Sequence, residues 1–123
     1  MITFKPKKYK EKDLIPEAID HLEKSRIPYN EVSKKDADEI SKINSKSMVL
    51  WEFKQDSDGK FKLTVQEKEG YRYTSKLLSN CGMKQIETDD KTRKTTAKID
   101  YLGKALGVLE ILGLHYNLSI VVW

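Results

Sequence analysis

The sequence predicts an α+β fold: an antiparallel β-meander with a long C-terminal helix packed on one face, N-terminal helices and a C-terminal strand. Three observations lead to it. After Thr95, apolar residues recur at helical spacing, at Ile99, Leu102, Leu106 and Leu109. Residues 47–74 alternate apolar and polar side chains, which is typical of strands with one buried face. The chain ends in Leu-Ser-Ile-Val-Val-Trp, a β-branched run of strand length.

Length and composition indicate one well-solvated domain, residues 1–123. A chain of 123 residues can bury a core without disulfides or metals. Charged residues make up 34% of it, above the usual ~25%, yet the net charge is only +4. The single cysteine excludes a disulfide framework and favours a reducing cytoplasm. No apolar run approaches the length of a signal or membrane span, so we expect a soluble protein without a membrane partner.

The first twelve residues form a basic segment with five lysines and one acid, Glu11. We expect a basic arm that lies along a phosphate backbone through Lys7, Lys8 and Lys10. The alternative is a solvated terminus. Residues 2–4 could add a short edge strand.

Two helices are predicted before the sheet. From Asp13 to Ser25, apolar residues at i, i+3, i+4 and i+7 form one helix face. Ser33 is well placed to cap a second helix that reaches about Ile43, and Asp36 in its first turn favours the positive end of the helix dipole. Because little of this second helix is apolar, we expect it to be the most peripheral one.

The predicted meander has three strands, separated by turns at residues 56–59 and 67–70 and ending at Tyr71–Tyr73. Strict alternation places six apolar side chains on the face under the C-terminal helix: Val49, Trp51, Phe53, Phe61, Leu63 and Val65. A short helix over residues 74–80, ended by Gly82, and a fourth strand over residues 83–88 follow.

The opposite face of the sheet is biased towards positive charge. It carries Glu52 and a set of basic residues: Lys54, Lys60, Lys62, Lys68 and Arg72. An open basic sheet can follow a phosphate backbone, with an exposed tyrosine stacking on a base. The alternative is the solvated face of a lysine-rich chain.

A second basic cluster precedes the C-terminal helix: Lys91, Arg93, Lys94 and Lys98. Cations are unfavourable at a helix start, so we expect an anion site there, built with backbone amides and threonine hydroxyls. The alternative is that Asp89 and Asp90 neutralise the turn. Within this helix, which Gly113 should end, Gly103 and Gly107 predict a close approach, either of the sheet or of a second copy in a homodimer.

Catalytic patterns are sparse, and we expect no enzyme, no metal and no cofactor. Two isolated histidines and one cysteine cannot supply a zinc site. The triplet Glu52-Phe53-Lys54, with Asp36 and Asp38 upstream, resembles the acid…Glu-x-Lys pattern of metal-dependent nucleases, which implies a magnesium-assisted hydrolysis. The two aspartates, however, fall on a predicted helix, where those enzymes use a strand or hairpin.

A second resemblance rests on element order. The succession of helix, three strands and helix, with the basic stretch Arg93-Lys94-Thr-Thr-Ala-Lys98, resembles double-stranded RNA-binding domains. An extra helix after Tyr73 departs from that family's pattern, so we transfer none of its binding residues.

Two functions remain open. The first is a small non-enzymatic accessory protein that binds DNA or RNA through phosphate contacts. The second is a compact protein-binding inhibitor or adaptor, of the phage, mobile-element or immunity type, without nucleic-acid contact. One continuous basic surface favours the first, whereas lysines interleaved with acids beside an exposed apolar patch favour the second.

Overall fold

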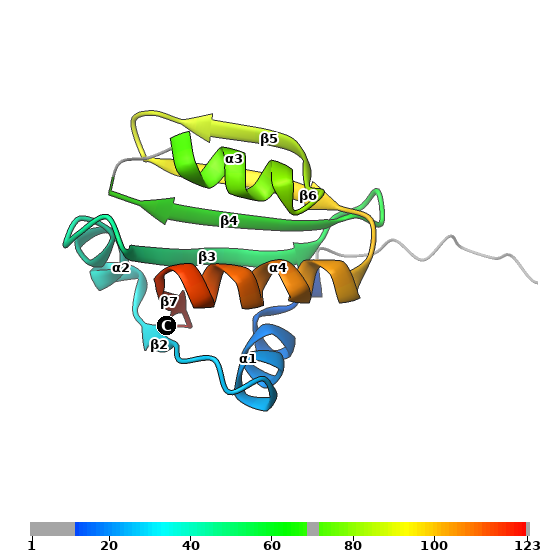
Figure 1. The fold of residues 1–123 in the computed structure, drawn as a ribbon, viewed down its shortest axis with the longest axis horizontal. Coiled ribbons are helices and arrows are strands. Elements are labelled where there is room, and N and C mark those ends of the chain that lie inside the picture. The colour runs from blue at the N-terminus through cyan, green and yellow to red at the C-terminus, as the bar shows by residue number, and fades with distance from the viewer. Residues whose placement is uncertain (1–11, 69–71, 123) are drawn as a thin grey trace, which may run out of the picture.

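A mixed β-sheet with helices on both faces makes up the described part of the chain, residues 12–68 and 72–122 of a computed structural model (Figure 1). In chain order the elements are β1 (Lys12–Asp13), α1 (Ile15–Lys24), β2 (Asn30–Val32), α2 (Lys34–Ser41), β3 (Ser47–Gln55), β4 (Phe61–Glu67), α3 (Arg72–Asn80), β5 (Lys84–Asp89), β6 (Lys94–Ile99), α4 (Leu102–His115) and β7 (Asn117–Val121). The predictions for Lys7, Lys8, Lys10, Tyr71 and the 2–4 strand, and for the Arg72 side chain, lie outside the described residues.

The sheet has the order β2-β7-β3-β4-β6-β5, and β1 pairs with the end of β3. Strands β3, β4, β6 and β5 are antiparallel neighbours, whereas β7 runs parallel to both β2 and β3. The predicted α+β class, with a C-terminal helix and strand, is confirmed. The prediction of a pure meander is wrong, because residues 72–73 begin a helix and β6 takes the place beside β4.

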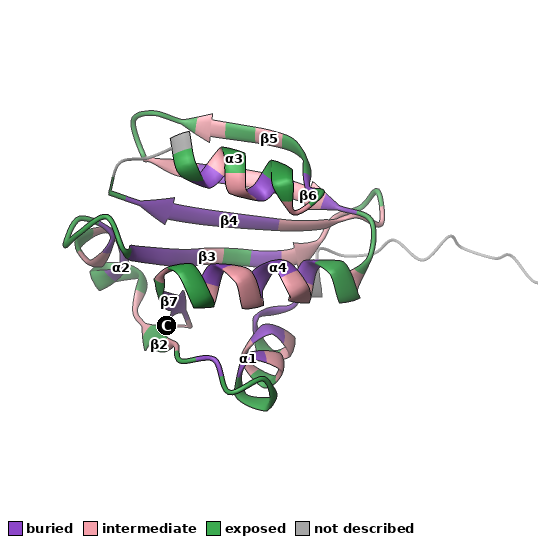
Figure 2. Cartoon of the chain, viewed as in Figure 1, coloured by how far each residue is buried: buried purple, intermediate pink, exposed green. Residues whose placement is uncertain are grey.

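The main core lies between the sheet and the helices α1, α3 and α4; α3 and α4 lie in front of the sheet in Figure 1. Its largest fully buried side chains come from both layers, as the purple segments in Figure 2 show: Leu22, Met48, Leu50, Phe53, Leu63, Leu78, Leu109, Leu112, Leu118 and Ile120. Helix α2 covers the opposite face with a smaller cluster, in which Ala37 packs against Val49 and Val121.

A bulge in β3 changes the predicted faces. The pairing register with β4 shifts between Leu50 and Glu52, so that Leu50 and Phe53 both enter the main core. Val49 and Trp51 belong instead to the α2 side, and their predicted placement under the C-terminal helix is wrong. The bulge adds one residue to the strand, and strict alternation cannot anticipate it.

Both N-terminal helices have the predicted character. In α1, Ile15, Ala18 and Leu22 are buried. In α2, the Ser33 hydroxyl accepts a hydrogen bond from the Asp36 amide at 3.2 Å, which satisfies one of the free donors at the helix start. None of the helices in the described ranges has the length and hydrophobicity to cross a bilayer.

The start and end of the long helix differ from the prediction. Residues 94–99 form β6, with Thr95, Ala97 and Ile99 buried and the residues between them only partly buried, so α4 begins at Leu102. Nor does Gly113 end the helix, which continues to His115. A Cβ built on Gly113 would overlap the Ile27 Cγ2 methyl, so this glycine permits close packing of the loop after α1.

Candidate functional site

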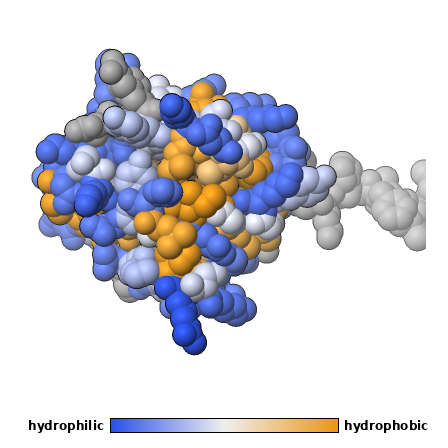
Figure 3. Space-filling view, in the orientation of Figure 1, coloured by the Kyte–Doolittle hydropathy of each residue, from blue (hydrophilic) through white to orange (hydrophobic). Residues whose placement is uncertain are grey.

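Helix α4 has an apolar face that points away from the core. Ala105, Val108, Leu109 and Leu112 are buried. The opposite side presents Gly103, Gly107 and Leu114, which is 74% exposed, flanked by the half-buried Leu106 and Ile111. In Figure 3 apolar side chains gather in a band across this face of the molecule, over α4.

The two glycines of this face are not contacted by the rest of the described chain. A Cβ built on Gly103 or Gly107 would meet no atom within 4 Å, so the sheet does not approach them. The first predicted explanation for the glycines is therefore wrong, and the homodimer contact stays a prediction. Glu110, a charged residue of this helix, is turned towards α1, where it contacts His21 Nε2 and accepts a hydrogen bond from the Ser25 hydroxyl at 3.1 Å.

The sheet face away from α3 and α4 carries a row of lysines, one from each of four neighbouring strands. Lys54 pairs in register with Lys62, Lys62 with Lys98, and Lys98 with Lys84. Like charges directly opposite one another destabilise a sheet. Two of these lysines, Lys54 and Lys62, belong to the predicted basic face; Lys60 and Lys68 lie in turns beside it, and Arg72 begins α3.

Carboxylates accompany this lysine row. Lys98 Nζ lies 2.8 Å from Asp56 and 3.1 Å from Asp58, which raises the pKa of Lys98. Lys54 Nζ lies 3.8 Å from Glu52. Lys62 forms no ion pair with any residue in the described ranges. The adjacent row on the same face reads Glu52, Thr64, Thr96 and Glu87, so a row with two carboxylates lies beside the lysine row.

A groove of about 1310 Å³ runs over this face, between the strands and one side of α1. Its charged lining is balanced, with four lysines and four carboxylates: Lys34, Lys54, Lys62, Lys94, Asp13, Glu52, Glu87 and Asp89. The net charge of the whole chain is +4, and residues 1–11, with four lysines and one glutamate, account for +3 of it. Residues 12–123 therefore carry a net charge of only +1. The described surface is therefore not one continuous basic patch.

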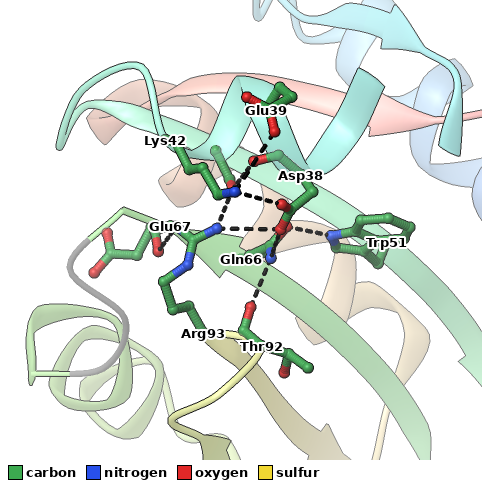
Figure 4. Close-up of polar contacts among 9 residues, drawn as sticks. Asp38, Glu39, Lys42, Trp51, Gln66, Glu67, Thr92 and Arg93 are labelled. Carbon is green, nitrogen blue, oxygen red and sulfur yellow. Dashed lines mark hydrogen bonds and ion pairs between the residues drawn. The ribbon is translucent and has the colours of Figure 1, made fainter. Parts of the chain in front are cut away.

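A network of polar contacts ties α2 to the sheet beside this groove (Figure 4). Gln66, only 1% exposed, lies at its centre. Its carbonyl oxygen accepts a hydrogen bond from Trp51 Nε1 at 2.8 Å, and its amide donates to Asp38 Oδ1 at 2.9 Å and to the Thr92 carbonyl at 2.6 Å. Every polar atom of the Gln66 side chain is thus engaged, which fixes its orientation.

Arg93 completes the network from the β5–β6 turn, where its φ is 62°. Its guanidinium donates to Asp38 Oδ1 at 3.2 Å, to the Ser41 hydroxyl at 2.8 Å and to the Glu67 carbonyl at 3.2 Å. A hydrogen bond from Lys42 and another from Gln66 hold the pKa of Asp38 below its ordinary value. Arg93, predicted to bind an anion at a helix start, instead binds three groups of its own fold.

Lys94 lies over the indole of Trp51, with its ammonium nitrogen 3.8 Å from the ring centroid. The predicted cluster around the helix start is therefore divided: Lys94 and Lys98 project from a strand, Lys91 is exposed in the turn, and Arg93 is turned inward. The sequence analysis assigned Trp51 to the main core. It also missed Gln66, because no regular spacing of residues in a sequence marks a glutamine that will be buried in a strand.

No three His, Cys, Asp or Glu side chains of residues 12–68 and 72–122 lie close enough to hold a metal, so Asp36, Asp38 and Glu52 do not come together as a three-ligand site. Burial raises the pKa of Cys81, which disfavours the reactive thiolate. Comparison with known proteins finds no matching family, no similar sequence among characterised proteins and no significantly similar solved structure.

Proposed function

We propose that this protein is a non-enzymatic protein-binding module that docks on its partner through the outer face of α4. The observation that carries the proposal is the apolar character of both sides of α4. A helix that is apolar all round is normally buried all round. Here the side with Gly103, Gly107 and Leu114 faces outward.

The glycines support the same conclusion through their energetic cost. At an interior helix position glycine costs about 1 kcal/mol relative to alanine, and no atom of the described chain meets a Cβ built on Gly107 to offset that cost. The cost is smaller at Gly103, which lies in the first turn of α4. Without a Cβ, a partner's backbone can approach this side of α4 closely.

The size of α4 limits the footprint of the partner. Fourteen helical residues span about 21 Å, which is too small for the ~800 Å² per partner of a standard interface. The contact must therefore extend onto neighbouring surfaces, such as the exposed side of α3 with Tyr73 or the loop with Tyr101, which are 72% and 63% exposed. Exposed aromatic side chains are frequent anchors of protein interfaces.

Site-specific photo-crosslinking tests this proposal. A photoreactive residue at position 107, in the protein expressed in its native cells and treated with nuclease, should give a discrete protein adduct that Leu114→Glu abolishes. The same residue at position 35, an exposed lysine of α2 on the opposite side of the sheet, is the matched control. Equal adduct patterns from both positions would contradict the proposal. An adduct of twice the chain mass would identify a second copy as the partner, and Gly107→Leu should then convert the dimer to monomer in light scattering.

Nucleic-acid binding is a second candidate, and the lysine row favours it. Four lysines occupy directly paired positions, and Lys62 among them forms no ion pair within the described residues, so a bound anion would relieve their repulsion. Strand β1, which follows the basic residues 1–11 in the sequence, pairs with β3 beside Lys54. The interleaved carboxylates and the balanced groove lining rank this candidate below the first.

Fluorescence anisotropy with single- and double-stranded oligonucleotides tests the second candidate. Lys62→Met should weaken binding and flatten the dependence of log affinity on log salt by about 0.7–0.9, as expected for one lost phosphate contact. Lys76→Met removes the same charge from α3 and should leave that slope unchanged. Wild-type affinity no tighter than ~10⁻⁴ M at low salt would exclude this candidate.

A further inference from the structure

A small hollow of about 140 Å³ lies where one end of the sheet meets the start of α4. Four lysines from four different places in the chain line it: Lys60 from the β3–β4 turn, Lys84 from β5, Lys98 from β6 and Lys104 from the first turn of α4. The lining also includes Asp100. The described residues that line this hollow differ from those that line the large groove, and Lys104 connects it to α4.

Positive charge in the hollow is only partly compensated. Lys98 is bound by Asp56 and Asp58. Within the residues that the structure describes, Lys60, Lys84 and Lys104 form no ion pair. Lys104 Nζ lies 5.1 Å from the centroid of the Tyr101 ring, and Asp100 supplies one negative charge to the lining. Lys84 is also the register partner of Lys98, so two ammonium groups project from directly opposed positions. Converging like charges are unfavourable unless a counterion lies between them.

We propose that this hollow binds a phosphate group. Lysine binds phosphate as a compact point charge, and several ammonium groups around a small volume suit a compact tetrahedral dianion better than an extended ligand. The phosphate can be free or can stand at the end of a nucleic-acid strand, since both present the same chemistry. The proposal is independent of docking through α4.

Titration of the ¹⁵N-labelled full chain with inorganic phosphate, against sodium chloride at equal ionic strength, tests the site. The amides of Lys84, Gln85 and Lys104 should shift and saturate. Lys84→Met and Lys104→Met should each weaken phosphate binding by about threefold or more, the size expected for loss of one exposed charge contact. Lys76→Met should not. The dispersion of amide signals in the NMR spectrum of each variant shows whether it has folded. If Lys84→Met does not fold, Lys84→Gln takes its place.

Two results would overturn the proposal: amide shifts that grow linearly without saturation, or equal weakening by Lys84→Met and Lys76→Met. Oligonucleotides with and without a 5′-phosphate separate the two sources of phosphate. Tighter binding of the phosphorylated strand, lost in Lys84→Met, supports a strand end. Saturable inorganic phosphate binding with no preference between strands supports a free phosphate. A Leu114→Glu variant that still binds phosphate would show that phosphate binding does not depend on the outer face of α4.

Discussion

The same substitution at two glycines of α4 should have opposite effects on stability. Gly107 and Gly113 lie six residues apart in one helix. Alanine at an interior helix position is favoured over glycine by about 0.8–1.0 kcal/mol. At Gly107 the new methyl meets no atom within 4 Å, so Gly107→Ala should raise the free energy of unfolding by nearly that amount.

At Gly113 the new methyl would overlap Ile27 Cγ2. Ile27 is only 7% exposed and its β-branched side chain has little freedom about χ1, so it cannot move aside at low cost. Overpacking of this kind costs about 1–3 kcal/mol. Because the propensity gain is smaller in the last helical turn, Gly113→Ala should lower the free energy of unfolding by about 1 kcal/mol.

Urea denaturation followed by circular dichroism measures both effects. A difference of about 2 kcal/mol between the two variants separates their midpoints by about 1 M, for an m-value of ~2 kcal/mol/M. In an Ile27→Ala background the overlap is gone, so Gly113→Ala should become neutral or stabilising. If Gly113→Ala costs the same in both backgrounds, or both glycines respond alike, the close packing inferred at Gly113 is refuted.

Three further outcomes are expected. Leu109→Ala should cost about 2–5 kcal/mol in urea denaturation because Leu109 is fully buried, whereas Leu106→Ala, at a half-buried position, should cost only about 1 kcal/mol. Asp38→Asn should destabilise by about 1–2 kcal/mol at pH 7, because Arg93 loses its anionic partner. Since the folded pKa of Asp38 is depressed, its ionised form stabilises the fold above about pH 4 and loses that effect as pH falls through the folded pKa, so wild type and Asp38→Asn should converge in acid. Thr64→Val should leave thermal stability unchanged or raise the free energy of unfolding by about 1 kcal/mol, because the buried Thr64 hydroxyl has no hydrogen-bond partner among the described residues.

Local rules predicted the elements whose signals lie within a few residues. The Ser33 cap is such a case, since a hydroxyl beside free amides defines a helix start without reference to the rest of the chain. The β3–β4 hairpin is another: Gly59, with a φ of 83°, marks the turn between two alternating strands. The α+β class followed from these signals together with the long C-terminal helix.

The errors arise where long-range pairing decides the structure. The stretch 94–99 is basic and adjoins a strong helical pattern, yet Thr95, Ala97 and Ile99 also fit the period of a strand. Pairing with both β4 and β5 selects the strand. The bulge in β3 likewise depends on what packs on each face, and no local signal marks it.

Sequence reasoning anticipated only part of each candidate site. It singled out Gly103 and Gly107. The arrangement of lysines into one row on the sheet face, however, can be seen only once the pairing register of the strands is known. The lysine row follows from residues as distant as Lys54 and Lys98 becoming neighbours through Lys62. The inward turn of Arg93 towards Asp38 was not predictable, because the two are 55 residues apart.

The position of β7 has a consequence for how the chain is made. Strand β7 lies between β2 and β3, and within the described residues β2 has no other strand partner. Roughly 85 residues are therefore synthesised after β2 before its partner exists, which takes about 4–17 s at 5–20 residues per second. For roughly the last 60 of these residues, between the end of β3 and the start of β7, β3 exposes an unpaired edge with Met48, Val49 and Leu50, a segment able to pair with another chain. The nascent protein should then depend most on holding chaperones before residues 117–121 emerge, and slowing translation just upstream of them should increase its aggregation.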